Sequence, residues 1–271
     1  MKGDLAGMID PHVHAAPEHI PRLLDDLELT RRAREAGMEG ILIKSHTSLT
    51  ASRATIAAHA VPGIRVWGGL VLNRAVGGLN PVAVETALAY GAAEVWMPTL
   101  DAVGQPGRSA PGISILEGSR LRTEVHEILD LIGQADIILG TGHLSVAETV
   151  ALVPIARAHG VRKILVTHPE APFLAMPHVT QRELARAGCL FERTWVFTTT
   201  ALGCVLAPDA LIADIRAVGS ESSVLASDMG QVGNPSPVEG FAAYVRLCRD
   251  SGFSEAEVRR MAAENIRDWL P

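Results

Sequence analysis

The chain has 271 residues and a mass of 28.8 kDa, and 48% of its residues are apolar, which predicts a folded protein with a sizeable core and argues against disorder. Its formal net charge is -6 and it has no cluster of Lys and Arg, so we expect neither a nucleic-acid partner nor an anionic membrane partner. No apolar run approaches the roughly 18 residues that a membrane-spanning helix needs.

The N-terminus and the cysteines indicate a cytoplasmic protein. The first residues, from Met1 to Leu5, lack the apolar core of a secretory signal. The three cysteines, Cys189, Cys204 and Cys248, are widely spaced and fit neither a disulfide framework nor a cysteine-based zinc site, so we expect buried, reduced thiols. The sequence leaves open whether the chain forms a homo-oligomer.

Short apolar runs recur along the chain and are predicted to be β-strands. Each run is continuous rather than alternating and is mostly β-branched or aliphatic, which is typical of a parallel strand buried on both faces. The eight runs are 7–14, 40–46, 65–72, 93–100, 136–143, 162–168, 195–201 and 223–228.

Helical segments are predicted between these runs. Asp25 and Asn80-Pro81 are helix starts, and capping boxes begin at Ser145 and Ser254. Strands that alternate with helices predict an α/β fold, and eight strands are the number that closes a (β/α)8 TIM barrel, here as a single domain over residues 1–271. A doubly wound open sheet is the alternative, weakened by the lack of a Gly-rich phosphate loop after the first strand.

One long irregular stretch, residues 101–118, follows the fourth predicted strand and is rich in Gly and Pro. A loop of this length is often functional, so it is either a lid over a site or surface decoration.

Histidines at the ends of the predicted strands carry the functional argument. His12 and His14 are two residues apart at the end of the first strand, so both side chains should point to the same face. His143, His168 and Asp228 end the fifth, sixth and eighth strands. In a closed barrel these side chains converge on the C-terminal mouth, where active sites of this fold are built. Imidazoles and a carboxylate are the ligands that zinc and similar ions prefer.

At these positions the sequence resembles the amidohydrolase superfamily, in its compact members. The matches are His-x-His after strand one, His after strands five and six, and Asp after strand eight. Residues 263–267, Ala-Glu-Asn-Ile-Arg, are also similar to the Glu-Asn pair of the family's terminal helix, and residues 10–17 resemble the opening of its decarboxylase-like branch. The resemblance implies one or two divalent metal ions, zinc before manganese, iron or cobalt, held by His12, His14, His143, His168 and Asp228.

The sequence departs from the pattern of many two-metal relatives, which carry Lys or Glu at the end of strand four. Residues 96–101 contain neither, which favours a single metal ion. Lys44 and His46 share parity at the end of strand two and offer a substitute. Lys44 would then be a carbamylated bridge, a base or a ligand for a substrate anion; the alternative is a packed lysine paired with a neighbouring carboxylate.

The resemblance implies metal-assisted hydrolysis of an amide, lactone, imide or ester bond in a small molecule. Asp228 would act as general base and then acid, and His168 or His46 would stabilise the oxyanion. Arg74, after strand three, is a candidate for binding a substrate carboxylate, although it would serve equally as a surface arginine paired with a helix carboxylate.

Three alternatives remain open at this point. A metal-dependent decarboxylase or hydratase would use nearly the same site, since reaction class is set by loops. A barrel without catalysis would serve as a binding protein. A three-metal phosphoesterase would need more clustered ligands than the sequence offers.

Overall fold

The computed structural model describes residues 4–107, 110–203 and 205–271. Cys204, and Arg108 in the long loop 101–118, therefore lie outside the described residues. Eight parallel strands form one sheet, in chain order except that a small hairpin interrupts the numbering. The strands are β1 Ile9–His14, β2 Gly40–Lys44, β3 Arg65–Val71, β4 Glu94–Trp96, β7 Ile138–Gly140, β8 Lys163–Thr167, β9 Leu190–Thr194 and β10 Ser223–Ala226. The hairpin is β5 Leu116–Glu117 with β6 Arg120–Leu121.

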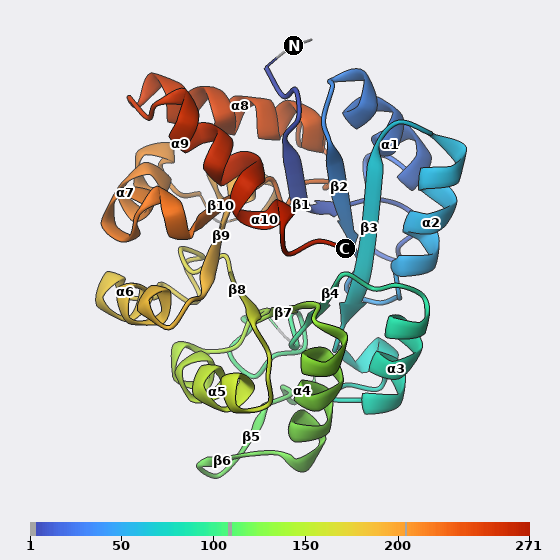
Figure 1. Cartoon of the computed structure of the whole chain (residues 1–271), viewed down its shortest axis with the longest axis vertical. Helices are drawn as coiled ribbons and strands as arrows, with labels where there is room; N and C mark the ends of the chain where they lie inside the picture. Colours follow the sequence, from blue (N-terminus) through green and yellow to red (C-terminus); the bar gives the residue numbers. More distant parts are fainter. Residues whose placement is uncertain (1–3, 108–109, 204) are drawn as a thin grey trace.

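The first and last strands meet and close the sheet into a barrel. The amide of Asp228 donates to the carbonyl of His12 at 2.9 Å, and the amide of His14 donates to the carbonyl of Met229 at 2.8 Å. Figure 1 shows the strands surrounded by helices, as a (β/α)8 barrel requires. The predicted fold class is therefore confirmed, and the open-sheet alternative is wrong.

Four helices, α1, α3, α5 and α9, begin at the starts that the sequence predicts. Asp25 and Asn80 each cap a helix, and reciprocal capping boxes are present at Ser145, Ser236 and Ser254. The helices are α1 Asp26–Glu35, α2 Ala51–Ala60, α3 Pro81–Ala89, α4 Thr123–Ala135, α5 Val146–Ala158, α6 His178–Arg186, α7 Pro208–Val218, α8 Pro237–Asp250, α9 Glu255–Arg259 and α10 Asn265–Arg267.

The prediction for the seventh strand is wrong. The strand is β9, and the apolar run 195–201 instead contains two short 3-10 helices, Trp195–Thr198 and Thr200–Leu202. The reason is that β9 contains two charged residues, Glu192 and Arg193, which are nevertheless fully buried. A search for continuous apolar runs passes over such a strand and selects the apolar residues that follow it.

One cluster of buried apolar side chains comes from the strands of the barrel and the C-terminal segment; this cluster is called the floor below. Ile266 and Leu270, from the C-terminal segment, pack against the floor residues. Figure 1 shows the C-terminus among the strands. The floor residues include Ile9, Leu42, Trp67, Val71, Trp96, Ile138, Leu165 and Val224.

The structure also tests the expectations for the cysteines and for membrane-spanning helices. Cys189 and Cys248 are buried free thiols, as predicted, and burial raises their pKa to about 11 and about 12. Within the described parts of the chain, no helix has the length and apolarity to cross a membrane.

Candidate metal centre

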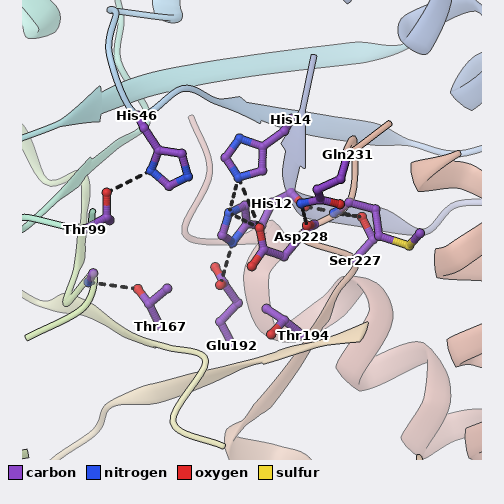
Figure 2. A network of polar contacts seen from close by, with 12 residues as sticks. His12, His14, His46, Thr99, Thr167, Glu192, Thr194, Ser227, Asp228 and Gln231 are labelled. Atoms are coloured by element: carbon purple, nitrogen blue, oxygen red, sulfur yellow. Dashed lines mark hydrogen bonds and ion pairs between the residues drawn. The ribbon is translucent and has the colours of Figure 1, made fainter. Parts of the chain in front are cut away.

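Three side chains converge at the C-terminal mouth of the barrel, from its first and last strands. His12 Nε2 lies 3.0 Å from Asp228 Oδ1, His14 Nε2 lies 3.1 Å from the same oxygen, and the two Nε2 atoms are 3.2 Å apart. Donors that bind one zinc ion at about 2.0–2.1 Å stand roughly 3.3 Å from one another in a tetrahedral arrangement. The three atoms therefore form a suitable face for a divalent ion (Figure 2).

The backbone around these ligands is irregular in a way that aims them. The pairing of β1 with β2 shifts register between Asp10 and Val13, and Asp228 adopts a left-handed φ of 52°. A non-glycine residue in that region is uncommon and tends to occur at functional sites. At Gly230 a Cβ would lie 2.0 Å from the carbonyl oxygen of His14, so only glycine allows this close approach of the chain after β10 to β1.

Electrostatics keep Asp228 and His14 in the protonation states that suit metal binding, whereas the carboxylates of Asp228 and Glu192 raise the pKa of His12. Burial alone would raise the pKa of Asp228, but His12 and His14 hold it well below its usual value. Burial, reinforced by the neighbouring Arg22 guanidinium, lowers the pKa of His14 to about 3. A charged carboxylate therefore faces a neutral imidazole, which is the form that binds metals.

Glu192 of β9 supports the cluster from beneath, and the sequence reading missed it. Its Oε1 lies 2.7 Å from His12 Nδ1, and both side chains are buried (Figure 2). A carboxylate on Nδ1 fixes the tautomer that leaves Nε2 free for a metal. A buried acid in a strand is the signal that would have found it, but the misplaced seventh strand hid that signal.

Lys44 and Glu94 also lie buried in the barrel interior. Neither the Lys44 Nζ atom nor the two Glu94 carboxylate oxygens has a hydrogen-bond partner among the described residues. Burial lowers the pKa of Lys44, and burial next to Glu192 raises that of Glu94 well above its usual value. Strand β4 ends at Trp96 and begins at Glu94, so its C-terminal end carries neither Lys nor Glu.

The remaining predicted histidines line the mouth without joining the tight cluster. Rings of His14 and His46 stack with centroids 4.9 Å apart, and those of His143 and His168 lie 4.8 Å apart. Thr99 hydrogen-bonds His46 Nδ1 at 2.9 Å, and Gln105 Oε1 lies 2.6 Å from His143 Nδ1. The group of three within 4.8 Å contains neither His143 nor His168.

His168 combines strain with an unpartnered atom. Its φ is 28°, and its buried Nδ1 has no hydrogen-bond partner in the described part of the chain. Burial lowers the pKa of His168 to about 4, so the ring is neutral at physiological pH.

A cavity of about 370 Å³ opens directly on the cluster, and its lining includes His14, Lys44, His46 and Asp228. The long loop contributes to its wall, from Gln105 to Gly107. Arg74, in contrast, is not among the lining residues: its side chain is 47% exposed, lies 3.5 Å from Asp101 and donates to the carbonyl of Pro111.

The closed barrel, with two histidines of β1 and an aspartate after β10 at its mouth, is similar in fold to a structure described as an amidohydrolase from Pseudomonas aeruginosa, with a TM-score of 0.65 at 12% identity over 97% of this chain and 94% of that one. The chain belongs to a family of unknown function, DUF6282, whose model matches residues 7–192. That match includes His12 and His14 and ends at Glu192, before Asp228.

Solved structures agree on the fold. A probable dipeptidase, PvdM, from Pseudomonas aeruginosa superposes with a TM-score of 0.71 at 10% identity, over 97% of this chain and 94% of that one. A dipeptidase described as a metallopeptidase gives 0.68 at 14% identity, over 98% and 99%. A mutant organophosphorus hydrolase from Deinococcus radiodurans gives 0.66 at 11% identity, over 100% and 95%. Such identities support the fold and leave the activity to be argued from the site. No curated protein matches the sequence.

Proposed function

We propose that the protein is a metal-dependent hydrolase that cleaves an amide, lactone, imide or ester bond in a small molecule. The observation that carries the proposal is the convergence of His12, His14 and Asp228 within 4.8 Å, at the mouth of a barrel and open to a cavity. The structural neighbours described as dipeptidase and organophosphorus hydrolase support hydrolysis as the reaction class.

A divalent ion bound at this cluster, zinc or alternatively manganese, iron or cobalt, would supply Lewis acidity and a water whose pKa falls to about 7. Asp228 then holds and moves the proton. Its Oδ1 faces both histidines, whereas its Oδ2 makes no hydrogen bond with a described residue and is available for the proton of the attacking water and, later, of the leaving group.

The other predicted site residues surround the position of a substrate carbonyl. His46 and His168 both line the cavity, and hydrogen bonds from either ring would stabilise negative charge on the carbonyl oxygen. Glu192 is a positioning residue, which acts through His12 Nδ1. Arg74 as a ligand for a substrate carboxylate would have to leave Asp101 and reach the cavity from its rim.

Three alternative roles for Lys44 are compatible with this proposal. Its unpartnered buried amine would bridge two ions after carbamylation, act as a base, or bind a substrate anion. The first role goes with two metal ions and the others with one, so metal stoichiometry separates them.

The first test is elemental analysis of protein purified without chelator. We expect at least one equivalent of a transition metal in the native chain, lost in His12→Ala and Asp228→Ala. Arg162→Met is the matched control, because Arg162 is exposed, pairs with Asp136 at 2.9 Å and precedes β8 at the opposite end of the barrel.

Each outcome has a consequence. Two equivalents would make Lys44→Ala the next variant. No metal, even after reconstitution, would overturn the proposal and favour a binding protein.

With metal present, a screen of amides, lactones, imides and esters should find hydrolysis that Asp228→Ala lowers by about 10²–10⁴-fold. Release of carbon dioxide without hydrolysis would instead identify the lyase that residues 10–17 suggest.

A further inference from the structure

Arg22, which lies in the loop after β1, is a buried cation in the wall of the metal-site cavity. Its Nε donates to Glu18 Oε2 at 2.6 Å, and its Nη2 lies 3.1 Å from His14 Nδ1. Its Nη1 has no hydrogen bond with a described residue, although the guanidinium side chain is only 3% exposed. A buried guanidinium with unused donors is suited to bind a carboxylate, which has the matching planar geometry.

Glu18 holds this guanidinium in place. The carboxylate of Glu18 is fully buried: Oε1 accepts from the His46 amide at 2.7 Å and from the Ser45 hydroxyl at 3.0 Å, while Oε2 accepts from Arg22. The contacts with Ser45 and His46 fix the loop after β1 to the loop after β2. Arg22 is therefore preorganised, which lowers the entropic cost of binding a ligand there.

Aromatic side chains line another part of the same cavity. Phe173 and Phe197 lie 6.3 Å apart, ring centroid to ring centroid, and both contact the His168 ring, at 5.7 Å and 5.4 Å. Leu202, after β9, extends this apolar wall. Such a surface favours an apolar or aromatic group that stacks against its rings.

The two walls come from different parts of the ring of strands, although Arg22 also pairs with Gln231 in the loop after β10. Arg22 and Lys44 follow or end the first and second strands of the ring, whereas Phe173 and Phe197 follow the sixth and seventh. In a ring of eight strands, the strands that carry the first pair of residues are about three strands away from those that carry the second pair, counted along the shorter way round. The largest possible separation in such a ring is four strands. The side chains of His14 and Asp228 line the same cavity.

We propose that the substrate is a small carboxylic acid with an apolar, preferably aromatic, body, whose carboxylate is bound by Arg22 and whose body lies against Phe173 and Phe197. This inference rests on the proposed function, since it places the reacting group between the two walls, over the metal cluster. The cavity of about 370 Å³ suits such a molecule, because small-molecule sites begin near 300 Å³. In its charged form, Lys44 in the same lining would add to the attraction for an anion.

The test is isothermal titration calorimetry with three probes, on zinc-loaded and on chelated protein. The probes are 3-phenylpropanoate, 3-phenylpropan-1-ol, which lacks the charge, and propanoate, which lacks the ring. We expect 3-phenylpropanoate to bind most tightly. Arg22→Met should weaken its binding at least about tenfold and leave the alcohol unaffected, whereas Phe173→Ala should weaken both.

Because Arg22→Met leaves Glu18 buried without its cation, the double variant E18Q/R22M is measured beside it, with Arg22→Lys as the conservative variant and Arg162→Met as the control. Arg22→Lys should retain part of the discrimination between acid and alcohol, and Arg162→Met all of it. Equal binding of 3-phenylpropanoate to native and E18Q/R22M protein, or equal binding of propanoate, overturns the proposal.

Chelated protein separates the two proposals. Binding that depends on zinc but not on Arg22 means that the carboxylate binds the metal, and the role of Arg22 is wrong while the metal site stands. Arg22-dependent binding to a protein that takes up no metal means that the role of Arg22 stands and the metal site is wrong. Absence of 3-phenylpropanoate binding to zinc-loaded native protein overturns the substrate class alone.

Discussion

On β2, Leu42 packs into the apolar floor of the barrel, whereas Lys44, two residues further along, lies unpartnered at the mouth. The same change occurs on β8, where the floor residue Leu165 is followed three residues later by the strained His168. Both layers are buried, so exposure to water does not distinguish them. Burial of apolar groups stabilises the fold, whereas burial of unpartnered charges costs stability unless a ligand offsets it. The comparison indicates that apolar burial in the floor stabilises the folded state, and that this offsets the destabilising burial of polar groups at the mouth.

The largest expected effect belongs to the floor. Leu165→Ala removes a fully buried side chain there and should lower the free energy of unfolding by about 2–5 kcal/mol, through lost apolar burial and a residual cavity. Urea denaturation measures the change, and elemental analysis should find the native metal content in the folded variant. A folded Leu165→Ala protein without metal would contradict the separation of the two layers.

The next effect tests the cost of buried charge near the mouth. Burial raises the pKa of Glu170, in the loop after β8, from 4.5 to about 7, despite the neighbouring Arg193. The folded state thus holds this proton more tightly than the unfolded state does. Its contribution to stability is complete below about pH 4.5 and is lost as the pH rises through about 7. At about 1.4 kcal/mol per pKa unit, the full contribution is about 3 kcal/mol.

Glu170→Gln should therefore flatten the pH dependence of stability between about pH 5 and 8. Its Oε1 can still accept from the Thr194 amide, a bond of 2.7 Å in the native chain, so the geometry is kept. Urea midpoints of chelated native and variant protein at both pH values measure the difference. Parallel pH profiles for the two proteins would show that Glu170 is not the titrating group.

The smallest effect concerns the support of the metal site. Glu192→Gln keeps an oxygen for His12 Nδ1 but removes the charge, and should lower metal affinity by about 10–100-fold. Competition with a chromophoric chelator measures the affinity. Glu192→Ala should cost more than Glu192→Gln; an equal loss in both variants would mean that the charge, and not the hydrogen bond, supports the site.

Much of this architecture was readable from the sequence because parallel strands obey local rules. The ends of the strands placed His12, His14 and Asp228 at one mouth, and the structure brings them together. The seventh strand was not predicted correctly because its buried Glu192 and Arg193 have partners that are distant in sequence. No local pattern therefore marks these two residues as interior.

The loops were harder to predict than the strands. Arg74 was the natural candidate for an anion, yet its contacts with Asp101 and Pro111 lie outside the metal cavity. Arg22 lines that cavity only because Glu18 joins two loops through the backbone of His46. Such a contact depends on three-dimensional loop geometry, and neither spacing nor hydropathy encodes it.

The closure of β10 on β1 also bears on the order in which the molecule assembles. Asp228 and His14 are separated by 214 positions in the chain, so the cluster cannot exist until the last strand has docked. Contacts of such high sequence separation form late, because the entropy of closing a long loop must be overcome first. A chain still emerging from the ribosome would hold two histidines without their aspartate. A metal ion bound at the end would then add a link between the first and last strands, beside the backbone hydrogen bonds that already join them.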